Sequence, residues 1–466
     1  MKLHWFSPLA PADTEIAHYT ARLLPALMSR AEVTLWTTQR DWDKELQKHA
    51  EVRRYETNHP PLAELNRDGM SVYHIGNNPL HHGAIWQLSR QHGGMVILHD
   101  TRLHHFFDGL YREQWQDLAG YLASMEFYYG EAGCIDAAES FSTEAHNIDS
   151  MAERYPLTRL ALAHALGVVV HTREAYDELN ELHRWPLAYA PLPFASYANA
   201  SSFASQDDSL FFKTRRATND SAVYRLIVCG YIGRNRRLDA VLHALAQMPE
   251  GKRFHLDIYG KLMDGEELRA LVDSLKLNGQ VTIRGFVAEK ELDAALARAH
   301  LGINLRYPTM GEASASQLRL WSHRLPSLVT QTGWYAALPT GTVAFVRPEH
   351  EIADIQMHLR AFLLEPQKFA RMGARGRALL EKAHTPERYA EIIIETAERA
   401  SCFRAQSLAN RLAERAGALM SDWSDALKTD SAHRKVATEI HTLLHAPVKS
   451  KPTINYQWKI SDADRH

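Results

Sequence analysis

Residues 301–330 read LGINLRYPTMGEASASQLRLWSHRLPSLVT, an apolar strand followed by a polar, glycine-containing loop and a predicted helix. The first turn of a helix has free backbone N–H groups and partial positive charge, so this order is typical of an anion-binding segment. We expect Ser314 and Ser316, with the amides around them, to hold a phosphate group. Glu312 has two interpretations: a helix-start residue that complements the dipole, or a carboxylate that contacts a polar ligand such as a sugar.

Length and composition indicate an ordinary globular protein of about three domains. The chain has 466 residues, 45% hydrophobic and 23% charged, and its 53 basic and 55 acidic side chains nearly cancel. A broad cationic surface for nucleic acid or anionic lipid is therefore not expected. Its three cysteines are odd in number and far apart, which favours a reducing compartment over a disulfide framework.

The N-terminal sequence MKLHWFSPLAP lacks the apolar run and small-residue cleavage site of a signal peptide. No stretch reaches the roughly 18 consecutive apolar residues of a membrane-spanning helix. We therefore expect a cytoplasmic protein whose membrane contact, if it makes one at the inner face, is peripheral.

The first part of the chain alternates short apolar strands with amphipathic helices, a pattern that predicts a parallel, doubly wound sheet. A helix follows the first strand, because the apolar residues between Ile16 and Leu27 fall on one face. Residues 106–165 are too many and too aromatic for a loop and are predicted to be a helical insertion. The predicted strands are 2–9, 32–38, 71–76, 95–99, 167–172 and 187–193.

A second alternating run follows a Ser-, Ala-, Asn- and Asp-rich segment that lacks periodicity and is predicted to be a linker. Its first helix carries apolar residues at helical spacing from Leu238 to Met248. The predicted strands are 224–230, 254–260, 280–286, 301–305, 326–330 and 342–347. Two such halves are expected to face each other across a cleft, with ligands beyond the carboxyl ends of the strands.

The sequence also predicts amphipathic helices after the second sheet. Residues 386–400 are expected to pack on one of the sheets, while the apolar residues between Leu408 and Leu427 either do the same or dock a partner protein. The predicted organisation is an N-terminal domain (1–193), a linker (194–222), a C-terminal domain (223–385), C-terminal helices (386–448) and a loose tail (449–466).

Three motifs of the second half agree in order and spacing with a known family. They are VCGYIGRNRRLDAVLHAL (228–245), GFVAEKELDAALARAHLGINL (285–305) and RYPTMGEAS (306–314) before the PSLVT strand. Over residues 1–400 the chain resembles a GT-B glycosyltransferase of glycosyltransferase family 4. The segments PLAPADTEIAHYTARLLPAL (8–27) and MVILHDTRLHHFF (95–107) are similar to those of bacterial members that build surface polysaccharides and O-antigens.

The resemblance implies a retaining transfer of a sugar from a nucleoside-diphosphate sugar, with neither a cofactor nor a metal. Glu312 matches the first carboxylate of the family's Glu-x7-Glu motif, with one residue of slippage, and would contact the donor sugar. The second glutamate has no counterpart, because Leu320 stands eight residues further on with Arg319 beside it. The family's usual contact to the ribose hydroxyls is therefore missing.

Cations are expected near the donor diphosphate, because loss of that group from the sugar concentrates negative charge on it. Arg234, Arg236 and Arg237 follow the turn from Gly230 to Gly233, and Lys261 follows the strand FHLDIYG. Guanidinium groups bind phosphate oxygens in bidentate fashion, although a solvated basic turn is the alternative.

Arg236 matches the family's phosphate-binding lysine. Tyr231 stands where the family often has an arginine, so the resemblance implies a clamp that is incomplete or rebuilt from Arg234.

Polar side chains stand at or just after the ends of two predicted strands of the N-terminal half, residues 71–76 and 95–99. By the resemblance, His99 is the counterpart of a histidine near the transferred sugar and the acceptor. We expect His74, Asn77 and Asp100 to shape the acceptor pocket. The alternatives are a hydrogen-bonded strand end for His99, a metal site in HDTRLHH (99–105), and turn formation around Asn77.

Three classes of function remain at this stage. The leading hypothesis is a glycosyltransferase that moves a sugar from a nucleoside-diphosphate sugar to a glycan or lipid-linked acceptor. A non-catalytic, glycosyltransferase-like partner protein is the second, because the second glutamate is missing and extra helices follow. An epimerase or hydrolase is the third, and it would need a set of carboxylates that the sequence does not show.

Overall fold

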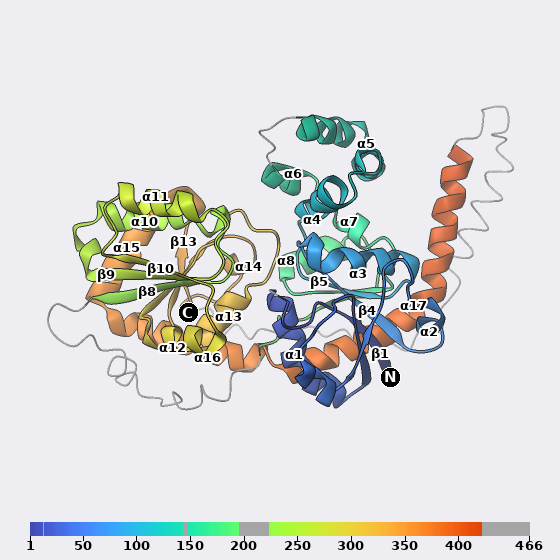
Figure 1. Ribbon diagram of the computed structural model, residues 1–466, viewed down its shortest axis with the longest axis horizontal. Helices are drawn as coiled ribbons and strands as arrows, with labels where there is room; N and C mark the ends of the chain where they lie inside the picture. The colour runs from blue at the N-terminus through green and yellow to red at the C-terminus, as the bar shows by residue number, and fades with distance from the viewer. Residues whose placement is uncertain (13, 143–147, 195–222, 422–466) are drawn as a thin grey trace. The chain divides into compact units, whose positions relative to one another are not determined.

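The computed structural model describes residues 1–12, 14–142, 148–194 and 223–421, which contain two parallel β-sheets (Figure 1). The first sheet consists of β1 (Lys2–Phe6), β2 (Glu32–Thr37), β3 (Glu51–Arg54), β4 (Met70–Ile75), β5 (Met95–Leu98), β6 (Gly167–Val170) and β7 (Leu187–Tyr189). The second consists of β8 (Tyr224–Cys229), β9 (Phe254–Tyr259), β10 (Val281–Gly285), β11 (Leu301–Asn304), β12 (Ser327–Thr330) and β13 (Ala344–Val346).

Both sheets have the doubly wound strand order. The first runs β3-β2-β1-β4-β5-β6-β7 and the second runs β10-β9-β8-β11-β12-β13. The order therefore reverses between β1 and β4 in one sheet and between β8 and β11 in the other, the positions where ligands of such sheets bind. The prediction of two Rossmann-like halves is confirmed.

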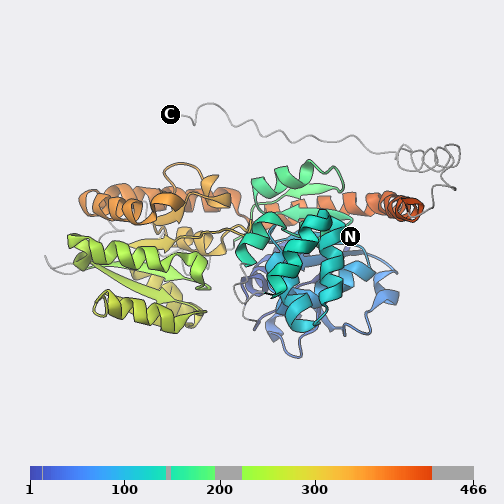
Figure 2. The ribbon, with the colours of Figure 1, turned by 90° about the horizontal axis from the view of Figure 1, so that it is seen from above.

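Helices cover both faces of the first sheet. One face packs against α1 (Glu15–Met28) and the first part of α17 (Pro386–Ser421). The other packs against α3 (Pro79–Gln91), α8 (Arg173–Asn180) and the predicted insertion, which is helical and appears as a teal group in Figure 2. The insertion comprises α4 (His104–Asp108), a π-helix (Gly109–Gln114), α5 (Leu118–Ser142), α6 (Ile148–Arg154) and α7 (Thr158–Ala161).

The second sheet is also covered on both faces (Figure 1). One side packs against α10 (Leu238–Gln247), α11 (Gly265–Ser274) and α15 (Glu351–Leu364), and the other against α12 (Glu289–Arg298) and α13 (Ala315–Ser322). Two further helices are α14 (Gly333–Ala336) and α16 (Pro366–Ala383), and α16 contacts α13 and α15. None of the helices described combines the length and apolar character needed to cross a lipid bilayer.

Some predicted boundaries were wrong. Several predicted strands ran past the observed ends, and β3 was missed because its sequence, EVRR, contains a single apolar residue. Residues 386–421 form one continuous helix, whereas separate helices over 386–400 and 408–427 were predicted. The predicted linker after Phe194, the end of the second of those helices, and the predicted tail lie outside the described residues.

The first part of α17 completes the core of the N-terminal half. Tyr389, Ile393 and Ala397 are buried in the same cluster as Leu3 and Trp5 of β1. A Cβ on Gly167 of β6 would lie 2.9 Å from the Cβ of Ala400, so helix and sheet are in close contact. Residues 386–400 of α17 are therefore part of the N-terminal half, although they follow the second sheet in the sequence.

We predict that Ile393→Ala lowers the free energy of unfolding by about 2–5 kcal/mol, because it leaves a cavity in this core. Chemical denaturation of the purified protein would measure the loss. Glu395→Ala, at an exposed position on the same helix, is the matched control. Equal effects of the two substitutions would contradict the packing described for α17.

Candidate functional site

Two glycines bring the loops after β8 and β9 together. Gly230 has φ +113° and Gly260 has φ +129°, conformations that favour glycine. A Cβ on Gly260 would lie 1.7 Å from the carbonyl oxygen of Gly230, so no other residue fits there without displacement of the loop. Gly233 starts the 3-10 helix Arg234–Arg236 that follows. The glycine turn predicted from the sequence thus lies at the carboxyl end of the central strand.

Arg236 lies buried at the point where the strand order reverses. Its Nη1 donates to Oδ1 of Asn304 at 2.9 Å, and its Nη2 donates to the carbonyl oxygen of Cys229 at 2.7 Å, so it joins the ends of β11 and β8. Burial, and secondly the neighbouring Arg306, lower the pKa of Arg236 to about 10. The guanidinium therefore remains charged at neutral pH, in a position with little access to water.

A hydrogen-bond network leads from Asn304 to the start of α13. Nδ2 of Asn304 donates to the Ser314 hydroxyl at 3.2 Å and to Oε1 of Gln317 at 3.1 Å. Ser314 is the N-cap of the helix, because its hydroxyl accepts from the backbone N–H of Gln317 at 3.1 Å. The Ser316 hydroxyl instead faces Gly230, whose added Cβ would lie 3.0 Å from it and 3.8 Å from Nη2 of Arg236.

The missing side chain of Gly230 thus leaves a small cradle. Its walls are a hydroxyl from the first turn of α13 and a buried guanidinium. Both donate hydrogen bonds, and the helix start adds partial positive charge, so the cradle suits an anionic oxygen.

Glu312 lies in the loop before α13 and is not its cap. Its Oε2 accepts from the backbone N–H of Met310 at 2.7 Å and from the Thr309 hydroxyl at 3.0 Å, and its Oε1 lies 2.7 Å from Nη1 of Arg306. Burial lowers the pKa of Arg306, but the Glu312 carboxylate, Tyr335 and Asp100 together more than offset this, and the net pKa is raised. The dipole-capping interpretation of Glu312 is therefore replaced by an ion pair.

This loop also contacts the segment after β5. The backbone N–H groups of Thr101 and Arg102 both donate to the carbonyl oxygen of Met310, each at 2.9 Å. Gly311 has φ +81°, and a Cβ there would lie 1.8 Å from the Thr101 hydroxyl. The contact brings Asp100 near Glu312: burial, followed by that like charge, raises the pKa of Asp100 to about 7.

Asn77 shapes the same segment through hydrogen bonds within the protein. Its backbone N–H donates to Oδ2 of Asp100 at 2.8 Å, its Nδ2 donates to the Arg102 carbonyl at 2.9 Å, and its Oδ1 accepts from the Phe106 N–H at 2.9 Å. All of these contacts fix the path from Asp100 to Phe106. In this structure Asn77 therefore supports the Asp100 loop.

His99 and His74 form a pair at the ends of β5 and β4. Nε2 of His99 lies 2.8 Å from Nδ1 of His74, and the His171 ring centroid lies 5.0 Å from that of His99. Burial, then the nearby His171 and His74, lower the pKa of His99, which keeps the imidazole neutral at neutral pH. His74 is fully buried and contacts His99 through this hydrogen bond.

Arg234 and Lys261 lie on the surface beside the glycine turn. The Arg234 side chain is 79% exposed, with Nη2 3.1 Å from Oε2 of Glu267 and Nε 3.6 Å from Oδ2 of Asp264. Lys261 is exposed, and its carbonyl oxygen accepts from the Ile232 N–H at 2.9 Å. Arg234 contributes to the wall of a cavity of about 240 Å³, but its charge is already matched by acids.

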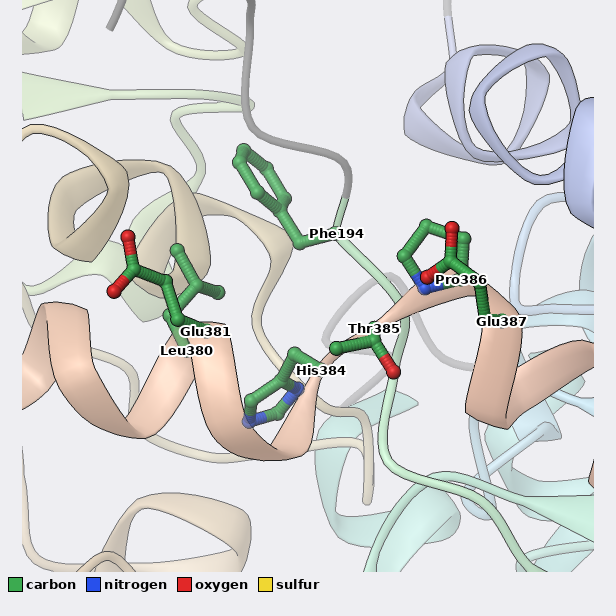
Figure 3. Close-up of a pocket in the computed structure, with 7 residues that line it drawn as sticks. All are labelled: Phe194, Leu380, Glu381, His384, Thr385, Pro386 and Glu387. Atoms are coloured by element: carbon green, nitrogen blue, oxygen red, sulfur yellow. The ribbon is translucent and has the colours of Figure 1, made fainter. Parts of the chain in front are cut away.

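A second cavity, of about 280 Å³, lies where the chain passes from α16 to α17 (Figure 3). There Nδ1 of His384 is 2.7 Å from the Leu192 carbonyl oxygen, and the Phe194 N–H donates to the His384 carbonyl at 2.8 Å. The predicted site residues do not line this cavity.

The metal alternative for HDTRLHH has little geometric support. His104 instead contacts the Tyr155 carbonyl oxygen at 2.7 Å and the Tyr121 hydroxyl at 2.8 Å, and His105 lies 3.0 Å from Asp149. Within the described part of the chain, no three His, Cys, Asp or Glu side chains are grouped so that they could hold a metal ion.

Sequence reasoning missed Arg306, Asn304 and Tyr335. Arg306 and Asn304 stand at the end of an apolar strand that was itself predicted, so their place at the carboxyl edge of the sheet was available from the sequence. Tyr335, in α14, gave no comparable pattern. Its importance appears only from its position beside Arg236 and Arg306.

No protein-family model matches the chain, and no curated protein matches it in sequence. Solved structures do match. Sucrose-phosphate synthase from Thermosynechococcus elongatus gives a TM-score of 0.58 at 14% identity, covering 85% of this chain and 98% of that one. HepE of Anabaena, in complex with UDP and glucose, gives 0.53 at 14% identity, with 85% and 99% covered. WaaG, a glycosyltransferase involved in lipopolysaccharide biosynthesis, gives 0.52 at 14% identity, with 84% and 99% covered.

These similarities extend over nearly the whole length of each known structure. Together with the two doubly wound sheets, they show that the chain has the GT-B fold. The fold predicted from the sequence is confirmed.

We predict that Asp100→Asn raises the melting temperature more at about pH 8 than at about pH 5. With its pKa raised to about 7, folded Asp100 holds a proton that the unfolded chain releases near pH 4. The folded state then binds more protons, so the contribution of Asp100 to stability falls as pH rises from about 4 to about 7. Asparagine removes this loss and keeps an oxygen for the Asn77 N–H.

Thermal unfolding of both proteins at the two pH values would test this, with Asp41→Asn as the exposed control. A shift of equal size at both pH values would contradict the burial of Asp100 beside Glu312.

Proposed function

We propose that this protein is a retaining glycosyltransferase that moves a sugar from a nucleoside-diphosphate sugar to a glycan or lipid-linked acceptor in bacterial surface polysaccharide synthesis. The C-terminal half would bind the donor and the N-terminal half the acceptor. The GT-B fold supports this proposal, as do the UDP complex of HepE and the role of WaaG in lipopolysaccharide biosynthesis.

The single observation that carries the proposal is the cradle at Gly230. A phosphate oxygen placed there would meet the Ser316 hydroxyl and lie close to the buried Arg236 guanidinium. The position coincides with the reversal of strand order, where doubly wound sheets bind ligands. Arg236 and the start of α13 would neutralise the departing diphosphate, and we propose that no metal is needed.

The second half of the chemistry would take place at the carboxylate loop. Glu312, the counterpart of the family's first glutamate, would contact the transferred sugar. His99 and Asp100, across the Met310 contact, would lie on the acceptor side. In a front-face transfer, a donor phosphate oxygen takes the proton of the acceptor hydroxyl while the bond from the sugar to that phosphate breaks and the new glycosidic bond forms.

We expect one class of nucleoside diphosphate and its sugar to raise the melting temperature, because a ligand that binds only the folded state stabilises it by mass action. A panel of UDP, GDP, ADP and their sugars would identify the base. Arg236→Ala is expected to reduce this shift strongly, since alanine removes the guanidinium that reaches toward the cradle.

Arg234→Ala is the matched control, and it should leave the shift nearly unchanged because Arg234 is already paired with acids. If the Arg234 variant lost the ligand-induced shift and the Arg236 variant kept it, the phosphate would instead bind at Arg234 on the surface. The absence of a shift with any nucleotide would reject the enzyme assignment and favour a non-catalytic partner protein.

A further inference from the structure

Three histidines stand at the carboxyl edge of the first sheet: His74 near the end of β4, and His99 and His171 directly after β5 and β6. Each lies two residues beyond an apolar residue of the core under α1 and α17, and side chains two residues apart in a strand share a face. The three rings therefore belong to the sheet face that these helices cover. Leu98 pairs with Val170 in the register of β5 and β6, so His99 and His171 are direct neighbours.

His99 is held between three rings. The His74 ring is stacked on it, with centroids 5.1 Å apart and an interplanar angle of 24°, and the 2.8 Å hydrogen bond joins the same two rings. The His171 ring lies 5.0 Å away, and Tyr19 of α1 meets His99 edge to face at 5.6 Å and 87°. Edge-to-face and offset-stacked arrangements are the favourable geometries of aromatic rings, so these contacts define the orientation of the His99 ring.

Tyr389 of α17 supports two of these three rings. Its ring meets Tyr19 edge to face, at 5.7 Å and 90°, and lies 5.7 Å from the His171 ring. All the supporting rings are buried, whereas His99 is partly exposed. The cluster thus extends from the interior of α17 to one histidine that a ligand can reach.

The histidines of this cluster are uncharged at neutral pH. Burial lowers the pKa of His74 and His99, and it lowers that of His171 to about 4. Neutral rings pack closely without charge repulsion, but polar rings still cost more free energy to bury than apolar side chains of similar size. Packing of the core alone therefore does not account for three histidines at this position.

Resting on the function proposed above, we propose that Tyr389 is a positioning residue for His99. It holds Tyr19 and His171 against the His99 ring, so that this ring keeps one orientation toward the bound ligand. Tyr389 is itself 1% exposed and acts through these neighbours. The first turns of α17 then have a second role besides covering the sheet, because they fix a side chain of the reaction site.

NMR of the full-length protein with ¹⁵N-labelled histidines would follow the His99 ring, whose signal is the one that His99→Gln removes. Tyr389→Leu should shift this signal, because Tyr19 and His171 lose the ring that supports them. Tyr389→Phe keeps the ring and should leave the signal near its wild-type position. Ile393→Ala is the matched control, because it makes a cavity in the same core one turn further along α17.

A second readout connects the orientation of His99 with the reaction. Release of UDP from UDP-glucose, or of GDP from GDP-mannose, would be measured with water as the acceptor. It should fall by up to roughly 100-fold in Tyr389→Leu, since misplacement of a reacting group by about 1 Å can cost that much. The nucleotide-induced rise in melting temperature should keep its wild-type size, because the cradle at Gly230 belongs to the second sheet. In Ile393→Ala both quantities should stay close to wild type.

The positioning role is overturned if Tyr389→Leu leaves the His99 signal unchanged or if Ile393→Ala shifts it equally. It is also overturned if the signal moves while nucleotide release continues at the wild-type rate. Failure of the proposed function gives a different result. Wild type then neither binds nor cleaves these donors, while the NMR comparison still decides whether Tyr389 orients His99.

Discussion

The site depends on one buried positive charge. Arg236 is held by a backbone carbonyl and a side-chain amide, and its hydrogen-bond partners within the described chain are neutral oxygens. Burial of a cation without a matching anion is costly, which is consistent with a position that a negatively charged ligand completes. Asn304, which accepts from this guanidinium, also donates to Ser314 and Gln317. Hydrogen bonds thus connect Arg236 with the end of β11 and the start of α13.

The fold was largely predictable because both halves repeat a simple pattern of apolar strands and one-sided helices. The errors in strand position occurred where the apolar pattern does not indicate which residues form backbone hydrogen bonds with a neighbouring strand. The segment 187–193 stays apolar after β7 ends at Tyr189, and EVRR joins the sheet edge with one valine. Between residues 400 and 408 the sequence shows no clear periodicity, yet the helix continues through this stretch.

The site was predictable at the level of loops and less so at the level of side chains. Gly230, Arg236 and Ser316 were all expected near a phosphate, and the structure brings them together. Arg234 is close to Arg236 in sequence, but its side chain lies on the surface and pairs with Glu267 of α11. His74 and Arg306 show the same limit, since the direction of each side chain depends on neighbours far away in the sequence.

The route of the last helix has a consequence for biosynthesis. One face of the first sheet is covered by α1 and by residues 389–400, which are made only after the whole second sheet. Until then, apolar groups of β1 and β2 on that face lack part of their cover. The first half of the growing chain is therefore incompletely packed until these residues are made, a state in which exposed apolar surface promotes association with chaperones or with other chains.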